Sequence, residues 1–482
     1  MAAYNSWNGI PMSIHPCLEE ITRKQWGNNG IICTDGGALK LLIEAHKSFP
    51  SFAEGAAAVV KATTGQFLDA YVPYVKEALE KGLLTEVDID KAIRGNIFVA
   101  LKLGLLDGDH SRNPYLSIGK DSTETPPFMT AEARRLAREV TAKSVVLLKN
   151  KNLLPLDAGK LRKIAVIGPY SDKIVQDWYS GTPPYETTIL SGIRNAVKED
   201  TEVIHAEDNR MDQAEKAAAA ADIAIVCVGN HPYGTRADWK FSPVPSDGRE
   251  AVDRKSLMLP DEDLVKLVLK ANPNTILVLV SSFPYTINWS QEHVPAIVHI
   301  THCSQEQGNG LADVLFGKVN PAGRTVQTWV KDITDLPDMM DYDIRNGRTY
   351  MYHQGPVLYP FGYGLSYSDF TYEKIESVKQ DKKNIRVTVS VKNTSGRDGE
   401  EVVQLYASYP DSKVERPSKQ LRAFKRIPIK AGESREVTLT VPKEELGYWN
   451  EEKQMFVVEP GTVKLLIGAS SEDIRLEGKV KL

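Results

Sequence analysis

The chain has 482 residues, of which 42% are hydrophobic and 25% charged, and its formal net charge is −4. This length exceeds what one hydrophobic core supports, so we expect roughly two to four domains. Charges of the two signs are interspersed, which favours neither nucleic acid nor an anionic membrane surface as a partner. The 4 cysteines lie far apart, which predicts buried thiols rather than a disulfide framework or a zinc site. No apolar run is long enough to span a bilayer.

The first region, residues 1–110, predicts loops and helices around one short strand. The apolar run over residues 30–33 indicates a buried strand, and it stops at Asp35. Thr85 and Asp88 resemble a capping box that opens a further helix. The expected helices cover residues 17–26, 38–46, 53–62, 75–81 and 85–103.

Asp35 is the first candidate for chemistry. Gly36 and Gly37 follow it and let the backbone turn tightly, so the Asp35 carboxylate should lie at the C-terminal edge of the strand. Barrels and open α/β sheets place their reacting groups at that edge. The alternative is structural, because an aspartate just before a helix often accepts hydrogen bonds from free backbone N–H groups. The pattern alone leaves both interpretations open.

Residues 111–130 are polar and proline-rich, which predicts a linker. Residues 131–345 then alternate apolar strands with helices, and this spacing predicts a mainly parallel sheet covered on both faces. No Gly-x-Gly-x-x-Gly loop follows a strand, so a nucleotide site is not expected. The expected strands are 144–148, 163–168, 223–229, 275–280 and 296–300, with helices over 131–142, 213–221 and 261–271.

After a connecting segment, residues 346–372, the chain changes to alternating polar and apolar residues separated by turn signals. This pattern over residues 373–482 is typical of an antiparallel β-sandwich.

A second carboxylate should lie in the long loop between residues 230 and 260. Cleavage of a glycosidic bond needs one carboxyl group to protonate the leaving oxygen and another to attack or stabilise the anomeric carbon. Glu250 is the leading partner for Asp35; Asp247 and Asp253 compete, although Asp253 beside Arg254 suits an ion pair.

Two other chemistries find little support in the sequence. His299 in a predicted strand and His302 just beyond it should point to opposite faces, which does not suit a shared metal ion. No Gly-x-Ser-x-Gly elbow is present for an acyl-transfer hydrolase.

Motifs along essentially the whole chain are similar to those of glycoside hydrolase family 3, and they occur in the family's order. They are Tyr4-Asn5-Ser6-Trp7-Asn8-Gly9-Ile10-Pro11, Ile31-Ile32-Cys33-Thr34-Asp35-Gly36-Gly37-Ala38, Ser144-Val145-Val146-Leu147-Leu148-Lys149-Asn150, Gly317-Lys318-Val319-Asn320-Pro321-Ala322-Gly323-Arg324 and Tyr359-Pro360-Phe361-Gly362-Tyr363-Gly364-Leu365-Ser366-Tyr367.

This resemblance implies a retaining β-glycosidase without a metal or organic cofactor. Asp35 matches the nucleophile, and Glu250 takes the acid/base role within residues 249–254, although both glycines that flank this glutamate in the family are replaced. The residues that match the lining of the family's sugar pocket are Met1, Tyr4, Gly36 and Ser144. The implied fold is α/β: a (β/α)8-type barrel, an α/β sandwich domain and a fibronectin type III-like β-sandwich.

The departure from the family is length. Only about 30 residues precede Asp35, so residues 1–110 can form only the C-terminal remnant of a barrel of roughly 250 residues. The family's Lys-His motif, and the Arg and Asp that hold the sugar hydroxyls, have no counterpart. We therefore expect a truncated product or fragment. The chain does not open with a signal peptide, and its compartment stays open, although the family is often periplasmic or secreted.

The function expected from these observations is hydrolysis of terminal non-reducing β-D-glucosyl residues. The substrate would be an oligosaccharide or an aryl β-glycoside, and neither nucleic acid nor a membrane is expected as a partner. A β-xylosidase of the same family and a non-catalytic, carbohydrate-associated module are the alternatives, and a homodimer is an open possibility for assembly.

Overall fold

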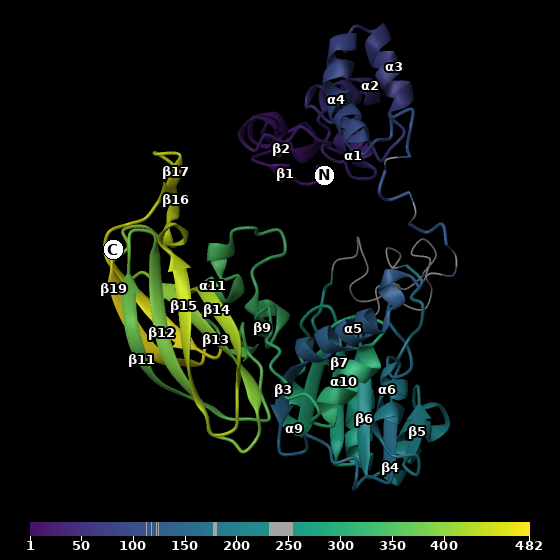
Figure 1. Cartoon of the computed structure of the whole chain (residues 1–482), viewed down its shortest axis with the longest axis vertical. Coiled ribbons are helices and arrows are strands. Elements are labelled where there is room, and N and C mark those ends of the chain that lie inside the picture. Colours follow the sequence, from purple (N-terminus) through teal and green to yellow (C-terminus); the bar gives the residue numbers. More distant parts are fainter. Residues whose placement is uncertain (112, 117, 122, 124, 177–180, 231–253) are drawn as a thin grey trace. The chain divides into compact units, whose positions relative to one another are not determined.

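A computed structural model describes residues 1–482 except 112, 117, 122, 124, 177–180 and 231–253 (Figure 1). The chain forms two compact units, Met1–Glu124 and Thr125–Leu482. In the part of the chain that the structure describes, no helix has the length and apolar character needed to cross a membrane.

The first unit is mainly helical, and α2 lies at its centre in contact with α1, α3 and α4. α2 is rich in alanine and valine, and its small buried side chains allow this close packing. The predicted capping box is confirmed, because Asp88 N donates to Thr85 Oγ1 and Thr85 N donates to Asp88 Oδ2. The elements are β1 (Ser6–Trp7), β2 (Ile10–Pro11), a π-helix (Leu18–Gln25), α1 (Ala38–Glu44), α2 (Phe52–Lys61), α3 (Val72–Glu80) and α4 (Glu86–Lys102).

The strand predicted over residues 30–33 is reduced to isolated parallel bridges. Cys33 pairs with Gln66, and Thr34 pairs with Ala2. Ala2 N donates to Cys33 O over 2.8 Å, and Thr34 N donates to Gln66 O over 3.0 Å. The apolar run therefore forms an extended, partly buried segment. It makes one bridge with each of two neighbouring segments and does not form a full strand.

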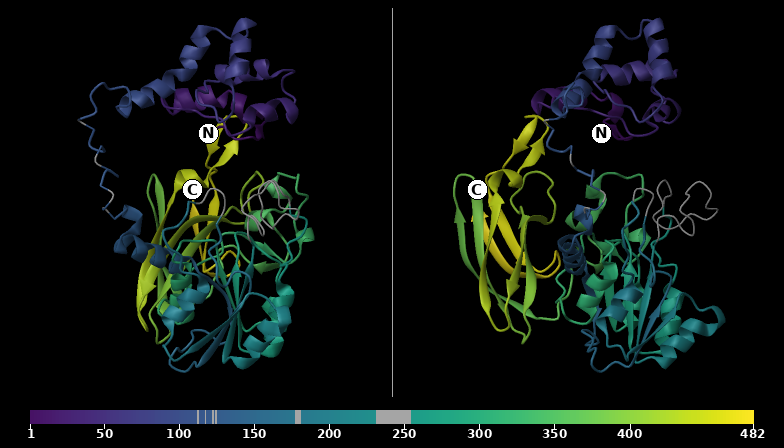
Figure 2. Two further views of the ribbon diagram at one scale, coloured as in Figure 1. Left: turned by 90° about the vertical axis from the view of Figure 1, so that its right-hand side faces the viewer. Right: turned by 45° about the vertical axis from the view of Figure 1, so that its right-hand side comes forward.

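The second unit begins with an α/β domain around a six-stranded sheet in the order β3-β8-β7-β6-β4-β5 (Figures 1 and 2). Four of its strand pairs are parallel, which confirms the predicted mainly parallel sheet. The remaining pair, β3 with β8, is antiparallel, so the sheet is mixed. The strand expected at 144–148 starts later, because α5 continues through Ser144. The strands are β3 (Val146–Asn150), β4 (Lys163–Ile167), β5 (Glu202–Ala206), β6 (Ile223–Gly229), β7 (Thr275–Val280) and β8 (Ala296–Ile300).

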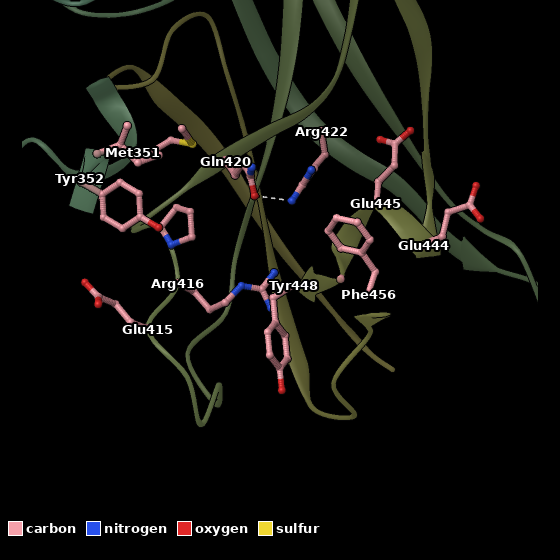
Figure 3. Close-up of a pocket in the computed structure, with 13 residues that line it drawn as sticks. Met351, Tyr352, Glu415, Arg416, Gln420, Arg422, Glu444, Glu445, Tyr448 and Phe456 are labelled. Carbon is pink, nitrogen blue, oxygen red and sulfur yellow. Dashed lines mark hydrogen bonds between the residues drawn. The ribbon is translucent and has the colours of Figure 1, made fainter. Parts of the chain in front are cut away.

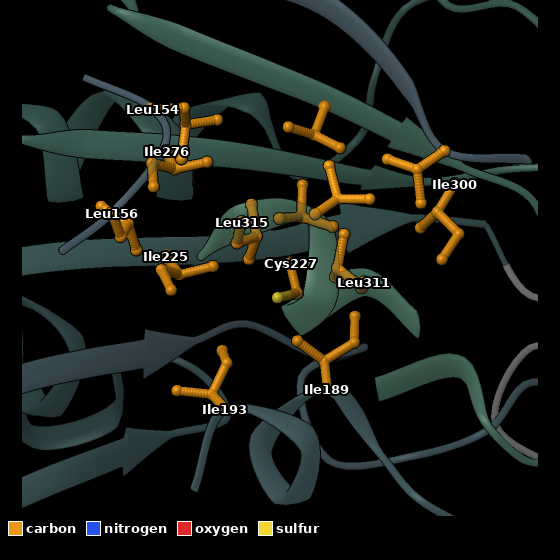
Figure 4. Close-up of a cluster of buried hydrophobic side chains, with 14 of the residues drawn as sticks. Leu154, Leu156, Ile189, Ile193, Ile225, Cys227, Ile276, Ile300, Leu311 and Leu315 are labelled. Carbon is orange, nitrogen blue, oxygen red and sulfur yellow. The ribbon is translucent and has the colours of Figure 1, made fainter. Parts of the chain in front are cut away.

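Helices cover both faces of this sheet, as the sequence predicts. Successive residues of β6 alternate between two hydrophobic clusters, with Ile225 and Cys227 in one cluster and Val226 in the other. Figure 4 shows the first of these clusters, with Ile225 and Cys227 among its members. Burial raises the pKa of the Cys227 thiol. The first cluster packs against α5 (Ala131–Ser144), α6 (Ile189–Ala196) and α10 (Gln307–Leu315), and the second against α7 (Gln213–Ala220), α8 (Glu262–Ala271) and α9 (Asn288–His293).

Helices α6 and α10 approach each other through glycine. A Cβ atom on Gly308 would lie 1.8 Å from Thr188 O, and one on Gly192 would lie 2.1 Å from the Gly308 carbonyl carbon. Gly308 N donates to Thr187 O over 2.8 Å, so the two backbones are in direct contact. Only residues without a side chain allow this approach.

A β-sandwich follows, as predicted. Its sheets have the strand orders β11-β12-β15 and β14-β13-β18-β19, and valine, leucine and isoleucine side chains fill the space between them. A short hairpin, β16–β17, projects from the sandwich (Figure 2). The strands are β11 (Phe370–Gln380), β12 (Asn384–Asn393), β13 (Gly399–Ser408), β14 (Gln420–Ile429), β15 (Ser434–Pro442), β16 (Tyr448–Asn450), β17 (Met455–Val457), β18 (Thr462–Gly468) and β19 (Ile474–Lys481). The two-stranded pair of β9 (Trp329–Val330) and β10 (Val357–Tyr359) and the helix α11 (Thr349–Tyr352) precede the sandwich.

Polar contacts join the sandwich to the segments before it. Arg324 Nη2 lies 2.9 Å from Glu401 Oε1, and these side chains are 10% and 4% exposed. Gln404 Nε2 donates to Gly362 O over 3.0 Å, and Asn320 Nδ2 donates to Asp398 O over 3.0 Å. We call these contacts the polar seam.

Replacement of Glu401 by glutamine is expected to lower the free energy of unfolding of the second unit by about 2 kcal/mol, because the buried Arg324 cation loses its counter-ion. Chemical denaturation of Glu401→Gln, Arg324→Met and the double variant measures the coupling. If the two single effects simply add, the pair is not coupled and the seam does not depend on it.

Candidate active site

Asp35 occupies the position that the sequence predicts, directly after the bridged residue Thr34. Its backbone N donates to Ala2 O over 3.2 Å, which ties the turn to the neighbouring segment. The side chain is half-buried, and Oδ1 accepts a hydrogen bond from Gly36 N over 2.8 Å. Among the residues that the structure describes, Oδ2 has no hydrogen-bond partner. The carboxylate is thus oriented through one oxygen, and the other is available.

The start of α1 is capped by Asp69, a residue that sequence reasoning missed. Gly37, with φ of 80°, turns the chain into the helix, and its N–H donates to Asp69 Oδ1. Leu39 N lies 3.4 Å from Asp69 Oδ2. The capping role that the sequence left open for Asp35 is therefore filled by Asp69.

Replacement of Asp69 by alanine should destabilise the first unit by about 1 kcal/mol, because the free N–H groups at the start of α1 lose their acceptor. Thermal unfolding and amide hydrogen exchange at residues 37–39 measure the effect, and Asp69→Asn is the matched control that keeps an acceptor. A larger loss of protection in Asp35→Ala than in Asp69→Ala would contradict this assignment.

Three of the residues predicted to line a sugar pocket lie around the Asp35 turn. The Tyr4 hydroxyl donates to Gly36 O, and His46 Nε2 lies 2.8 Å from Tyr4 O. A Cβ atom on Gly36 would meet none of the described atoms within 4 Å. Met1, next to the bridged residue Ala2, is 75% exposed. Tyr4 and Gly36 thus make direct contact, and His46 is a second residue that the sequence analysis missed.

The remaining predicted site residues lie in the second unit. Ser144 ends α5, donates from Oγ to Thr141 O over 2.8 Å and lines a cavity of about 410 Å³ together with Phe283 and Trp329. Glu250 and its competitors Asp247 and Asp253 lie outside the described residues.

Arg254, four positions after Glu250, is described. Its guanidinium stacks 3.8 Å above the ring of Phe283, and Nη1 donates to Pro284 O over 3.2 Å. This cation–π contact attaches the chain directly after residues 231–253 to the loop that follows β7.

The two histidines considered as metal ligands each have a partner in the protein. His299 Nε2 donates to Ser281 O over 3.0 Å, and His302 Nε2 donates to Asn230 O over 2.9 Å. Burial lowers the pKa of His299 to about 4, so this ring stays neutral at physiological pH. No group of three or more metal-ligating His, Cys, Asp or Glu side chains occurs among the described residues.

Two family models match the chain. The one described as the glycosyl hydrolase family 3 C-terminal domain matches residues 145–367, and the one described as a fibronectin type III-like domain matches residues 401–471. This match identifies residues 145–367 as a glycosyl hydrolase family 3 C-terminal domain. The predicted α/β domain followed by a fibronectin type III-like sandwich is thereby confirmed.

Curated relatives include a periplasmic beta-glucosidase from Salmonella typhimurium, which is 29% identical over 98% of this chain and 66% of its own length. A beta-xylosidase from Formosa agariphila is also 29% identical, over 98% of this chain and 67% of its own length. A solved beta-glucosidase from Erythrobacter marinus superposes with a TM-score of 0.82 at 26% identity, covering 98% of this chain and 66% of that one. The chain thus spans about two thirds of the length of the relatives it matches.

Proposed function

We propose that this chain carries the nucleophile and the acid/base of a retaining β-glycosidase that removes terminal non-reducing β-D-glucosyl residues from oligosaccharides or aryl glycosides. The observation that carries this proposal is that Asp35 has a carboxylate oxygen available for reaction. The residue lies at the end of a bridged segment, and Asp69 rather than Asp35 caps α1. One oxygen of the Asp35 carboxylate has no hydrogen bond among the described residues.

In the proposed reaction, a carboxylate oxygen of Asp35 attacks the anomeric carbon while Glu250 gives its proton to the glycosidic oxygen. The bond from the anomeric carbon to that oxygen breaks, and the aglycone leaves as an alcohol. Glu250, now a carboxylate, removes a proton from water. The resulting nucleophile displaces Asp35 and releases the sugar with its original anomeric configuration. The two carboxyl groups are expected to be roughly 5 Å apart in the competent enzyme.

Met1, Tyr4, Gly36 and Ser144 are proposed to line the sugar pocket. The hydrogen bond from Tyr4 to Gly36 O holds the turn that follows Asp35, and thereby the direction of the carboxylate. Gly36 has no side chain, so this position cannot supply an aromatic ring to pack against the leaving-group sugar beside the nucleophile.

A β-xylosidase is the second candidate, because the beta-glucosidase and the beta-xylosidase among the relatives are equally similar to this chain, both at 29% identity.

The test is hydrolysis of aryl β-glucoside and aryl β-xyloside by the chain alone and by the chain mixed with a separately produced N-terminal segment. This segment covers the third of a relative that the chain does not match. We expect little turnover from the chain alone and retaining hydrolysis after complementation, with the better substrate deciding between glucose and xylose. No turnover from two folded halves that form a stable complex would contradict the proposal and favour a non-catalytic module.

A further inference from the structure

A cavity of about 690 Å³ lies at the hairpin end of the β-sandwich (Figure 3). Its walls come from α11, β14 and the chain before it, the 3-10 helix Lys443–Leu446 and the hairpin β16–β17. This volume lies within the range of roughly 300–1,000 Å³ that is typical of small-molecule sites. The described residues that line this cavity have no part in the proposed reaction.

Aromatic rings form part of the wall. Tyr352, Tyr448 and Phe456 all line the cavity, and Phe456 is 67% exposed. Phe456 pairs directly with Trp449 across the hairpin, and their ring centroids are 5.4 Å apart. Exposed aromatic faces on a projecting hairpin indicate a surface that is covered in use. A pyranose ring suits such faces, because its C–H groups pack on the aromatic ring while its hydroxyl groups point away.

One arginine holds this wall in place. The Arg416 side chain is 6% exposed, its guanidinium lies 3.7 Å above the Tyr409 ring, and Nη2 donates to Leu446 O over 2.9 Å. Arg416 also lies 5.6 Å from the Tyr448 ring, a cation–π contact that favours this position of the ring before a ligand binds. A preorganised wall lowers the entropic cost of binding.

A second arginine has hydrogen-bonding capacity to spare. Arg422 Nη2 donates to Gln420 Oε1, and Figure 3 shows these two side chains together at the cavity wall. Arg422 Nε is buried and has no hydrogen-bond partner among the described residues. A buried donor without an acceptor is costly, and a ligand oxygen could relieve that cost.

The charges around the cavity select the kind of ligand. Glu415, Glu444 and Glu445 line it together with the two arginines, so both signs are present. A phosphate or another polyanion would meet three carboxylates, whereas a neutral molecule that carries both donors and acceptors can use every group. Sugar hydroxyls are such groups. We propose that this cavity binds a neutral stretch of a glycan chain that is not undergoing cleavage.

The experiment measures binding by titration calorimetry with neutral cello-, laminari- and xylo-oligosaccharides; the choice of these sugars rests on the proposed function. The protein is the full chain carrying Asp35→Ala, which removes turnover. We expect saturable binding that weakens about tenfold in Phe456→Ala and in Arg422→Met. The matched control is Tyr115→Ala, which removes an exposed aromatic ring outside the sandwich and should leave binding unchanged.

Circular dichroism melts verify that each variant is folded. Two outcomes would overturn the proposal: no saturable binding of any of the sugars, or binding that is unchanged in both Phe456→Ala and Arg422→Met. A change in sedimentation from dimer to monomer in Phe456→Ala, without sugar binding, would identify the hairpin as an interface between copies instead. Because binding is measured without turnover, its failure is distinct from a failure of the hydrolysis assay.

Discussion

Replacement of Asp35 by alanine is expected to abolish hydrolysis of aryl β-glycosides by the complemented enzyme, with kcat reduced roughly 10⁴-fold or more. In the proposed mechanism, loss of this carboxylate removes the group that would form the covalent glycosyl-enzyme and balance the positive charge at the anomeric carbon. Steady-state kinetics with an aryl glucoside measure the loss. The fold should survive, because among the described residues only the neighbouring Gly36 N–H donates a hydrogen bond to the Asp35 side chain. Residual turnover above about a tenth of the parent rate would contradict the proposed nucleophile.

A comparison of the two carboxylates separates their roles. In Asp35→Gly, added azide should restore turnover by attacking the anomeric carbon directly, which gives a glycosyl azide of inverted configuration. In Glu250→Gln, an activated dinitrophenyl glycoside should still be cleaved in the first step, because its leaving group needs no proton, while an alkyl glycoside should fail. If Glu250→Gln slowed both substrates equally, the acid/base role would belong to another residue, with Asp247 and Asp253 as the next candidates.

Replacement of Gly308 by alanine is expected to cost the second unit about 3 kcal/mol or more of unfolding free energy, because the added Cβ would lie 1.8 Å from Thr188 O. The obstacle is backbone, so no change of side-chain rotamer relieves it, and α10 must move away from α6. Urea unfolding measures the loss.

Gly396→Ala is the matched control for Gly308→Ala. A Cβ atom on Gly396 meets none of the described atoms within 4 Å. This variant should therefore change the unfolding free energy by less than about 0.5 kcal/mol. Equal midpoints for the two variants would show that α6 and α10 adjust without cost.

Much of the fold was predictable because apolar periodicity is local. The strands β6, β7 and β8 coincide with apolar runs, and α2 and α8 begin and end within a few residues of the expected positions. The direction of β3 could not be predicted, because an edge strand pairs on one side only and no crossover helix determines its orientation. The sequence analysis also missed β5, which is only partly buried, and the helices α6 and α10, whose glycines weaken their helical pattern.

The candidate site was predictable only as far as its motifs extend. Asp35 and its glycines form a contiguous pattern, so their turn could be expected from the sequence. The role of Asp69 could not be predicted, because its capping of α1 depends on a contact across 32 residues, between Gly37 and the loop before α3. The same holds for His46, whose contact with Tyr4 spans 42 residues. A contact between distant segments leaves no periodic signal in one sequence.

The polar seam has a consequence for how proteins of this kind can be recombined. Its bonds are directional and join particular atoms, such as Gln404 Nε2 and Gly362 O. A sandwich taken from a relative would bring its own hydrogen-bond donors and acceptors. Each donor or acceptor that does not match would leave a buried polar group without a partner. Chimaeras should therefore tolerate an exchange of the sandwich only when the segment from Asn320 to Gly362 travels with it. The segment from Asn320 to Gly362 and the β-sandwich therefore act as one unit in recombination. A crossover point in a chimaeric gene should lie before Asn320 rather than between this segment and the sandwich.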